Sequence, residues 1–215
     1  DIVIFLNGIP VVIFELKSND ETLKKYPRAF VLQVCQTLES DGFKTSFKVL
    51  NKDEKPMPFC IGAHTAFNCP LKDGETLEDY QIIFDKEETA YNMLLNDQGC
   101  VQGPSETLML DHTKIMPLRY EVFEKIDTIV FKNLQSTGVS LRHPETGHGI
   151  HMDFKGFPMM AFWTKGKEKA PFLCVEPWHG CAAFENESGN FEDKEFCMIL
   201  QDAECKEFSY KVSVF

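Results

Sequence analysis

The chain has 215 residues, of which 43% are hydrophobic and 12% aromatic, enough for one sizeable core and a single domain spanning residues 1–215. Its 33 acidic and 22 basic side chains give a net charge of −11, which repels phosphate backbones and anionic lipid surfaces. This balance excludes general nucleic-acid binding and argues against a membrane partner.

No run of residues approaches the roughly 20 apolar positions of a membrane-spanning helix. The apolar segment 2–14 has neither the basic flank nor the cleavage site of a signal peptide. We therefore expect a soluble, cytoplasmic protein. The eight cysteines occur singly in apolar segments of a chain that can build its own core, which favours buried reduced thiols over disulfides.

The first predicted element is a β-hairpin over residues 1–17. An Asn7-Gly8 pair lies between two apolar runs, and Asn-Gly accepts the positive φ angles of a type I′ turn. A three-residue turn would place Asp1 opposite Glu15, whereas a tight two-residue turn would place Asp1 opposite Phe14. The apolar pattern also predicts that the hairpin pairs with the rest of the sheet.

Short apolar or alternating runs, separated by turn residues, follow along the rest of the chain. Such spacing is typical of an all-β sandwich. Helical periodicity is weak and is confined to a turn or two after Asn19-Asp20 and to residues 118–126. The predicted strands are residues 30–38, 46–50, 81–84, 107–110, 128–131, 139–141, 150–154, 159–163, 172–176, 197–200 and 208–215.

The hairpin segment resembles the nuclease core of type I restriction endonuclease subunits, where an Asp and a Glu-x-Lys triplet on adjacent strands hold a divalent metal. Asp1 and the triplet beginning at Glu15 match this pattern. No helicase motor, P-loop or basic DNA track follows them. The resemblance implies a foreign segment over residues 1–17, as in a chimera. It leaves a PD-(D/E)xK nuclease fragment as an alternative to a purely structural hairpin.

Four blocks of sequence carry a second resemblance, at residues 15–27, 57–71, 147–154 and 170–180. They are similar to successive segments of the bacterial aldose 1-epimerase family, over residues 15–215. The resemblance implies an all-β, galactose mutarotase-like sandwich (supersandwich) with a small sugar as ligand and no cofactor or metal. The implied function is the interconversion of α and β anomers of a hexose or hexose phosphate by acid–base ring opening.

Ring opening requires an acid at the ring oxygen and a base at the anomeric hydroxyl, with the roles exchanged on closure. The resemblance identifies His64 as the acid; histidine titrates near neutral pH, and the small residues Gly62 and Ala63 before it leave room for a sugar. It identifies Glu176 as the base. Five apolar residues precede Glu176, so we expect a partly desolvated carboxylate with a raised pKa. The alternatives are a structural histidine and a surface glutamate.

Four further residues are expected to bind the sugar. Asp127 occupies a position similar to the acidic residue that holds sugar hydroxyls in the family, although an Asp before a strand can also be a turn residue. Trp178 and Phe67 offer aromatic faces for the C–H side of a sugar, with core packing as the alternative. Asn68 is the fourth expected contact.

Two sets of side chains include metal-ligand types but lack the paired close spacing of a structural zinc site. We therefore expect no metal at either. The sets are Cys60, His64 and Cys69, and Cys174, His179 and Cys181.

Members of the resembled family carry a further N-terminal stretch, including a histidine and an arginine of the sugar pocket. We therefore expect an N-terminally truncated sandwich whose exposed sheet edges promote self-association. The residue after the catalytic-type histidine is usually proline in the family and is Thr65 here, which removes a restraint on the backbone of His64. A non-catalytic carbohydrate-binding remnant is the second functional hypothesis.

Overall fold

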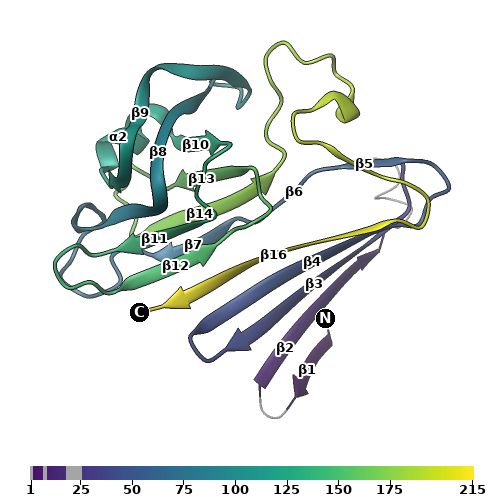
Figure 1. Ribbon diagram of the computed structural model, residues 1–215, viewed down its shortest axis with the longest axis horizontal. Coiled ribbons are helices and arrows are strands. Elements are labelled where there is room, and N and C mark those ends of the chain that lie inside the picture. The colour runs from purple at the N-terminus through teal and green to yellow at the C-terminus, as the bar shows by residue number, and fades with distance from the viewer. Residues whose placement is uncertain (1, 7–8, 18–25) are drawn as a thin grey trace.

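The computed structural model describes the backbone of residues 2–6, 9–17 and 26–215, and the side chains of residues 26–215. Nearly all of its regular elements are strands, arranged in two main sheets (Figure 1). The all-β prediction is therefore confirmed. No helix within the described residues has the length and apolar character needed to cross a bilayer.

The larger sheet is antiparallel and has nine strands in the order β1-β2-β3-β4-β16-β12-β11-β8-β9. Its strands are β1 (Ile2–Leu6), β2 (Ile9–Lys17), β3 (Phe30–Glu39), β4 (Gly42–Asn51), β8 (Gln81–Leu95), β9 (Val101–Pro117), β11 (Gly138–Arg142), β12 (Gly149–Asp153) and β16 (Cys205–Val214).

The smaller sheet runs β10-β13-β14-β6, and β7 also pairs with β14. Its strands are β10 (Thr128–Lys132), β13 (Met159–Trp163), β14 (Phe172–His179), β6 (Ile61–Gly62) and β7 (Thr65–Asn68). The remaining elements are the pair β5 (Met57–Phe59) and β15 (Met198–Leu200), the 3-10 helices η1 (Leu77–Asp79) and η2 (Phe191–Asp193), and the helix α2 (Tyr120–Ile126). The helix predicted over residues 118–126 is confirmed as α2, whereas the turn expected after Asn19-Asp20 lies outside the described residues.

The N-terminal hairpin is part of the larger sheet. Ile2 lies opposite Ile13, which is the register of the tight two-residue alternative. The register that sets Asp1 opposite Glu15 is therefore wrong, and Asp1 itself lies outside the described residues. The predicted pairing of the hairpin with the rest of the sheet is confirmed, because β2 pairs with β3 and places Glu15 opposite Gln33.

The main core lies between the two sheets. Alternate residues of a strand point to opposite faces, so each central strand contributes one apolar row to the interior. Leu141 of β11 and Met152 of β12 come from the larger sheet, and Phe162 of β13 and Val175 of β14 come from the smaller one; all are almost fully buried. We call the other side of the smaller sheet, turned away from this core, its outer face.

The long β8–β9 hairpin bends from the larger sheet over the outer face of the smaller one. Near its start, Ile82 pairs with Leu141 of β11. Several register shifts between β8 and β9 follow, and such bulges bend and twist a strand pair. Farther along, Asn92 Oδ1 accepts a hydrogen bond of 2.7 Å from the Val130 backbone of β10, and Met93 packs beside Val130 in a second apolar cluster.

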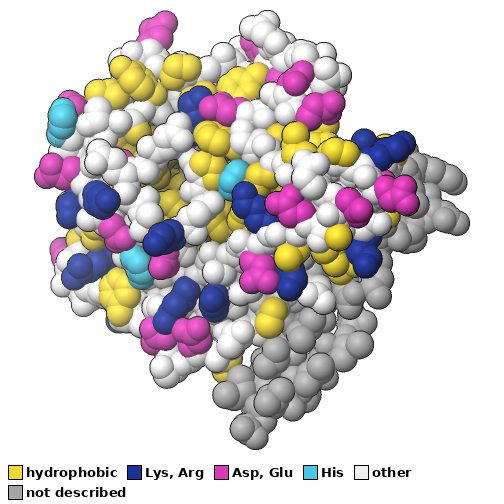
Figure 2. Space-filling view, turned by 45° about the vertical axis from the view of Figure 1, so that its right-hand side comes forward, with side chains coloured by type: hydrophobic (Ala, Val, Ile, Leu, Met, Phe, Trp, Pro, Cys, Tyr) yellow, Lys and Arg dark blue, Asp and Glu magenta, His cyan; other side chains and the backbone are white. Residues whose placement is uncertain are grey.

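The surface carries both signs of charge. On the face shown in Figure 2, acidic and basic side chains are interspersed rather than separated into blocks. Two of the close pairs are Lys211 with Glu39, at 2.8 Å, and Lys48 with Glu207, at 3.2 Å. Exposed pairs of this kind contribute little to folding stability. The net charge of −11 is thus consistent with a solvated surface of mixed sign.

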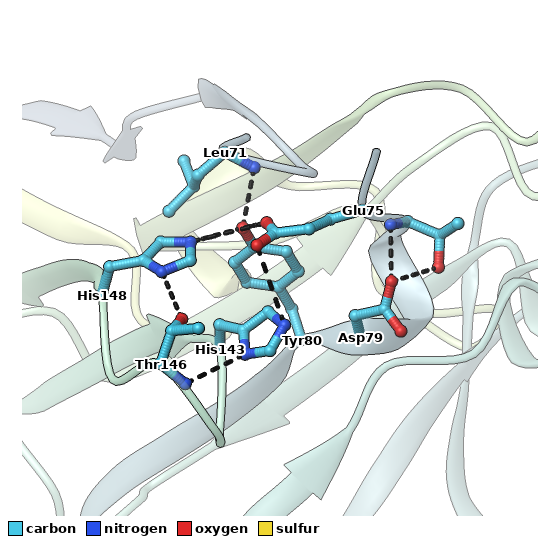
Figure 3. A network of polar contacts seen from close by, with 8 residues as sticks. Leu71, Glu75, Asp79, Tyr80, His143, Thr146 and His148 are labelled. Carbon is cyan, nitrogen blue, oxygen red and sulfur yellow. Dashed lines mark hydrogen bonds and ion pairs between the residues drawn. The ribbon is translucent and has the colours of Figure 1, made fainter. Parts of the chain in front are cut away.

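A polar cluster joins the segment before β8 to the turn between β11 and β12 (Figure 3). The Tyr80 hydroxyl donates to Glu75 and contacts His148 Nε2 at 2.8 Å. The Glu75 carboxylate also lies 3.5 Å from His148 Nε2 and 3.8 Å from His143 Nε2. The Tyr80 hydrogen bond, followed by the two imidazoles, holds the pKa of Glu75 below its ordinary value.

We expect Glu75→Gln to lower the melting temperature by a few degrees at neutral pH, because glutamine still accepts from Tyr80 but carries no charge. Because the pKa of Glu75 is lowered in the folded state, its negative charge stabilises the fold at pH values above the ordinary pKa of glutamate. This stabilisation is lost as the pH falls through the lowered pKa. The difference from wild type should therefore shrink in acid, as measured by circular dichroism. Asp73→Asn, at an exposed carboxylate of the same segment, is the control. Equal melting temperatures of Glu75→Gln and wild type at neutral pH would contradict the assignment.

Candidate active site

Residues 61–68 run antiparallel to β14 and determine which side chains share the outer face. Thr65 lies opposite Val175, and continuing this register brings His64 level with Glu176. Leu173 and Val175 point into the main core. Because side chains alternate along a strand, Glu176 and its neighbour His64 lie on the outer face.

His64 and Glu176 form a close pair with unequal exposure. His64 Nδ1 lies 3.4 Å from Glu176 Oε1. The His64 side chain is 63% exposed, whereas the Glu176 side chain is only 3% exposed. Burial raises the pKa of Glu176, opposed by the nearby His64 and by a hydrogen bond from the Trp178 indole. The desolvation expected for this carboxylate is therefore observed.

The pair lines a cavity of about 370 Å³, within the range of about 300–1,000 Å³ typical of small-molecule sites. Trp178 forms part of its wall, and Gly62 lies opposite Trp178. A Cβ at Gly62 would lie 2.7 Å from the Trp178 ring, so only glycine leaves room for the indole in this position. The segment from Gly180 to Ala182 forms another part of the wall.

The wall formed by residues 180–182 is held by the β8–β9 hairpin. The Val101 backbone N–H donates to the Ala183 carbonyl at 2.7 Å, and the Glu185 N–H donates to the Val101 carbonyl at 3.0 Å. Phe184 packs in the same apolar cluster as Val101 and Trp178. The bent hairpin thus supports one side of the cavity.

Trp163 links Asp127 to His64. The Trp163 and His64 rings meet edge to face with centroids 5.9 Å apart. The Trp163 indole N–H donates to Asp127 Oδ1 at 3.3 Å, and the Thr128 hydroxyl donates to Asp127 Oδ2 at 2.8 Å. Asp127 follows α2 with a φ of 59° and lines a neighbouring cavity of about 610 Å³ that also includes Trp163. Sequence reasoning did not single out Trp163.

Two of the other expected sugar contacts lie on opposite faces of β7. Asn68 is exposed and lies opposite Phe172, on the outer face but farther along β14 from Glu176. Phe67 lies opposite Leu173 and packs against the main core, so the packing supports the core interpretation of this residue. The structure therefore brings together His64, Glu176 and Trp178, with Asp127 reached through Trp163.

Thr65, the residue expected to leave the backbone of His64 less restrained, is fixed by two contacts. It pairs with Val175, and its hydroxyl lies 2.9 Å from the Tyr210 hydroxyl of β16. The residue after His64 is therefore anchored to both sheets.

All eight cysteines, which lie within residues 26–215, are free thiols. Neither of the two metal-ligand sets considered from the sequence comes together among the described residues. A different group does, namely His64, Cys174 and Glu176, whose ligand atoms all lie within 4.8 Å of one another. The sequence feature that could have indicated this group is the Cys-x-Glu spacing of Cys174 and Glu176, which puts both side chains on one face of a strand.

A sequence model of the family described as Aldose 1-epimerase matches residues 9–204. The chromosomal protein LacX of Lactococcus lactis subsp. lactis is 35% identical over 205 residues, which make up 94% of this chain and 68% of LacX. The family match begins at the first residue of β2, so it includes part of the segment expected to be foreign. Nothing in these similarities supports a restriction-endonuclease origin for that segment.

Two of the solved structures that match this chain show that it has the same fold as they do. One is a galactose mutarotase related enzyme from Lactobacillus acidophilus, with a TM-score of 0.88 and 25% identity over 99% of this chain and 70% of that one. The other is a galactose mutarotase-like protein from Lactobacillus casei, with a TM-score of 0.88 and 27% identity over 99% of this chain and 72% of that one. The predicted mutarotase-like sandwich is thereby confirmed.

Replacing Trp178 with Phe should raise the pKa of Glu176 further. The substitution removes the indole hydrogen bond that favours the ionised carboxylate and keeps an aromatic ring against the cavity. Carbon-13 NMR titration of the Glu176 carboxyl would measure the change. Tyr91→Phe, at an exposed aromatic residue, is the control and should leave the titration unchanged. An unchanged or lowered pKa in Trp178→Phe would show that the hydrogen bond has no such effect.

Proposed function

Since the chain belongs to the aldose 1-epimerase family, we propose that it interconverts the α and β anomers of a hexose or hexose phosphate. His64 acts as the general acid and Glu176 as the general base. The observation that carries the proposal is the 3.4 Å contact between these two side chains on the wall of one cavity. The ring oxygen and the anomeric hydroxyl of an aldose are bonded to the same carbon, so two groups this close can serve both oxygens.

In the proposed reaction, protonated His64 gives its proton to the ring oxygen while Glu176 accepts the proton of the anomeric hydroxyl. The bond between the anomeric carbon and the ring oxygen breaks, leaving an open-chain aldehyde and a hydroxyl group. Rotation about the next carbon–carbon bond presents the other face of the aldehyde. On closure, protonated Glu176 returns a proton to the aldehyde oxygen and neutral His64 takes one from the hydroxyl, so both groups recover their starting states.

The surroundings of Glu176 suit a base. Burial raises the pKa of its carboxyl, and a base with a higher pKa accepts a proton more strongly once ionised. The contact with His64 and the Trp178 hydrogen bond oppose this rise and favour the ionised form, which is the form that accepts the proton. The two effects together keep the carboxylate both basic and available.

Three further side chains are proposed to hold the sugar. Asp127 accepts hydrogen bonds from sugar hydroxyls in addition to those from Trp163 and Thr128. Trp178, at the cavity wall, offers its ring to the C–H side of the sugar. Asn68 remains a prediction as a hydroxyl contact, as do cytoplasmic location and self-association through sheet edges. No step of this proposal requires a cofactor.

The exposure of His64 favours a second candidate function. An acid whose side chain is 63% exposed exchanges protons readily with water, and a catalytic site gains from excluding water. A chain that binds a sugar without interconverting its anomers would have the same cavity and the same aromatic wall. Binding and exchange therefore need to be measured together.

We expect His64→Asn and Glu176→Gln each to slow anomer exchange by about 10²–10⁴-fold, which is the usual contribution of a positioned acid or base. The measurement is NMR exchange between α and β anomers of glucose, galactose and their 6-phosphates. His112→Asn and Glu106→Gln, at exposed side chains, are the matched controls. Exchange that persists in both site variants refutes the assignment of acid and base. Sugar binding without exchange in the wild-type chain supports the second candidate.

For Asp127→Asn we expect a rise in KM of about tenfold or more with kcat little changed, because a charged acceptor for sugar hydroxyls is lost. Asparagine still accepts a hydrogen bond from the Trp163 indole, so the contact between Trp163 and His64 is retained. Steady-state kinetics of anomer exchange would provide both constants, with Asp202→Asn at an exposed carboxylate as control. A fall in kcat with unchanged KM would instead mean that Asp127 acts only through Trp163 and His64.

A further inference from the structure

The outer face of β14 carries one ionisable side chain that the proposed reaction does not use. Cys174 lies two residues before Glu176 on the same strand, and Ala66 is its partner on β7. Its sulfur, a ring nitrogen of His64 and a carboxylate oxygen of Glu176 lie within 4.8 Å of one another. No other group of three metal-ligating side chains is as compact within the described part of the chain.

We propose that His64, Cys174 and Glu176 bind one zinc ion, and that the ion blocks the acid–base pair. Zinc accepts this mixture of imidazole, thiolate and carboxylate ligands, whereas magnesium and calcium prefer oxygen ligands alone. Three protein ligands leave the fourth tetrahedral position open towards the cavity, where a water molecule completes the set. The binding of zinc is independent of the proposed function, but its inhibitory effect rests on that function.

The distances fit a shared ion with little rearrangement. Ligand bonds of about 2.0–2.1 Å at a tetrahedral centre place an imidazole nitrogen and a carboxylate oxygen about 3.3 Å apart. His64 Nδ1 and Glu176 Oε1 are already 3.4 Å apart. A thiolate bond of about 2.3 Å places the sulfur about 3.6 Å from the other ligand atoms. Since Cys174 Sγ lies within 4.8 Å of a ring nitrogen of His64 and of a carboxylate oxygen of Glu176, an adjustment of about an ångström completes the site.

The charges around the group also favour a cation. Cys174 and Glu176 are both 2% exposed. Their side chains lie on one face of β14, so a thiolate and a carboxylate formed there would repel each other with little water to screen them. A doubly charged ion removes this repulsion, because it stabilises the thiolate and the carboxylate together. On binding, the Cys174 thiol releases its proton to the solvent as the sulfur–zinc bond forms, with no change of oxidation state.

Occupation of the group by zinc is incompatible with the proposed catalysis. The ion uses the lone pair of His64 and the carboxylate of Glu176, which are the atoms that move protons in ring opening. His64 can reach the ion without disturbing the core because its side chain is largely exposed, while the two strand residues are fixed by the sheet. Zinc would therefore act as an inhibitor that competes with the sugar for the cavity.

The test uses the reduced, metal-free chain titrated with Co²⁺, which takes the place of Zn²⁺ and reports its ligands by optical absorption. We expect one equivalent to bind with the visible bands of tetrahedral coordination and an ultraviolet band from thiolate-to-metal charge transfer, and one equivalent of Zn²⁺ to abolish both. Cys174→Ser should remove the charge-transfer band and weaken Zn²⁺ binding at least about tenfold. Cys181→Ser is the matched control, since Cys181 lines the same cavity but is not in the group, and it should keep the band.

Cys174→Ala and Glu176→Gln provide second variants should the serine substitution disturb folding, and both should weaken Zn²⁺ binding. The absence of tetrahedral cobalt bands in the wild-type chain, or an equally strong charge-transfer band in Cys174→Ser, would overturn the proposal. Anomer exchange measured with and without Zn²⁺ separates the two assignments. Exchange that Zn²⁺ does not slow overturns the inhibitory role, whereas cobalt binding in a chain without exchange supports the metal site and contradicts the proposed function.

Discussion

The antiparallel pairing of residues 61–68 with β14 sets the face on which every candidate side chain lies. Because side chains alternate along a strand, a slip of one residue would turn His64 towards the core and bring Ala63 or Thr65 to the outer face. The slip is opposed from both sides of the sheet: Ala63 is buried in the main core, and the Thr65 hydroxyl contacts Tyr210 of the larger sheet. The contact between His64 and Glu176 therefore depends on the packing of both sheets.

The proposed acid and base differ in how firmly they are held. Glu176 lies within β14, between β13 and the segment 61–68, and is almost fully buried. His64 lies in the short break between β6 and β7 and is largely exposed, with the edge of Trp163 against its ring. A rigid, desolvated carboxylate beside a more accessible imidazole lets a ligand enter from the side of the histidine. Because His64 is accessible while Glu176 is fixed, the two side chains can also adapt to a ligand other than a sugar.

Much of the fold could be predicted from the sequence, because the short alternating runs correspond to strands of the two sheets. The bending of β8 and β9 could not, since their apolar period is broken where the register shifts and the hairpin bends over the smaller sheet. For the site, the resemblance supplied His64 and Glu176, and strand alternation explains why they meet. The motif alone did not predict on which face of β7 the Phe67 side chain lies. Its neighbours Ala66 and Asn68 face outward, whereas the Phe67 ring packs in the core.

The residues added by the structure depend on contacts between segments distant in sequence. Trp163 reaches His64 only because β13 and the segment 61–68 lie on either side of β14. The wall at residues 180–182 is likewise held by Val101, at the tip of the bent β8–β9 hairpin. A substitution that straightened this hairpin would open the cavity without changing any of the residues proposed to touch a sugar. The motifs around His64 and Glu176 supply the proposed acid and base, and the bent hairpin and the sheet order give the cavity its shape.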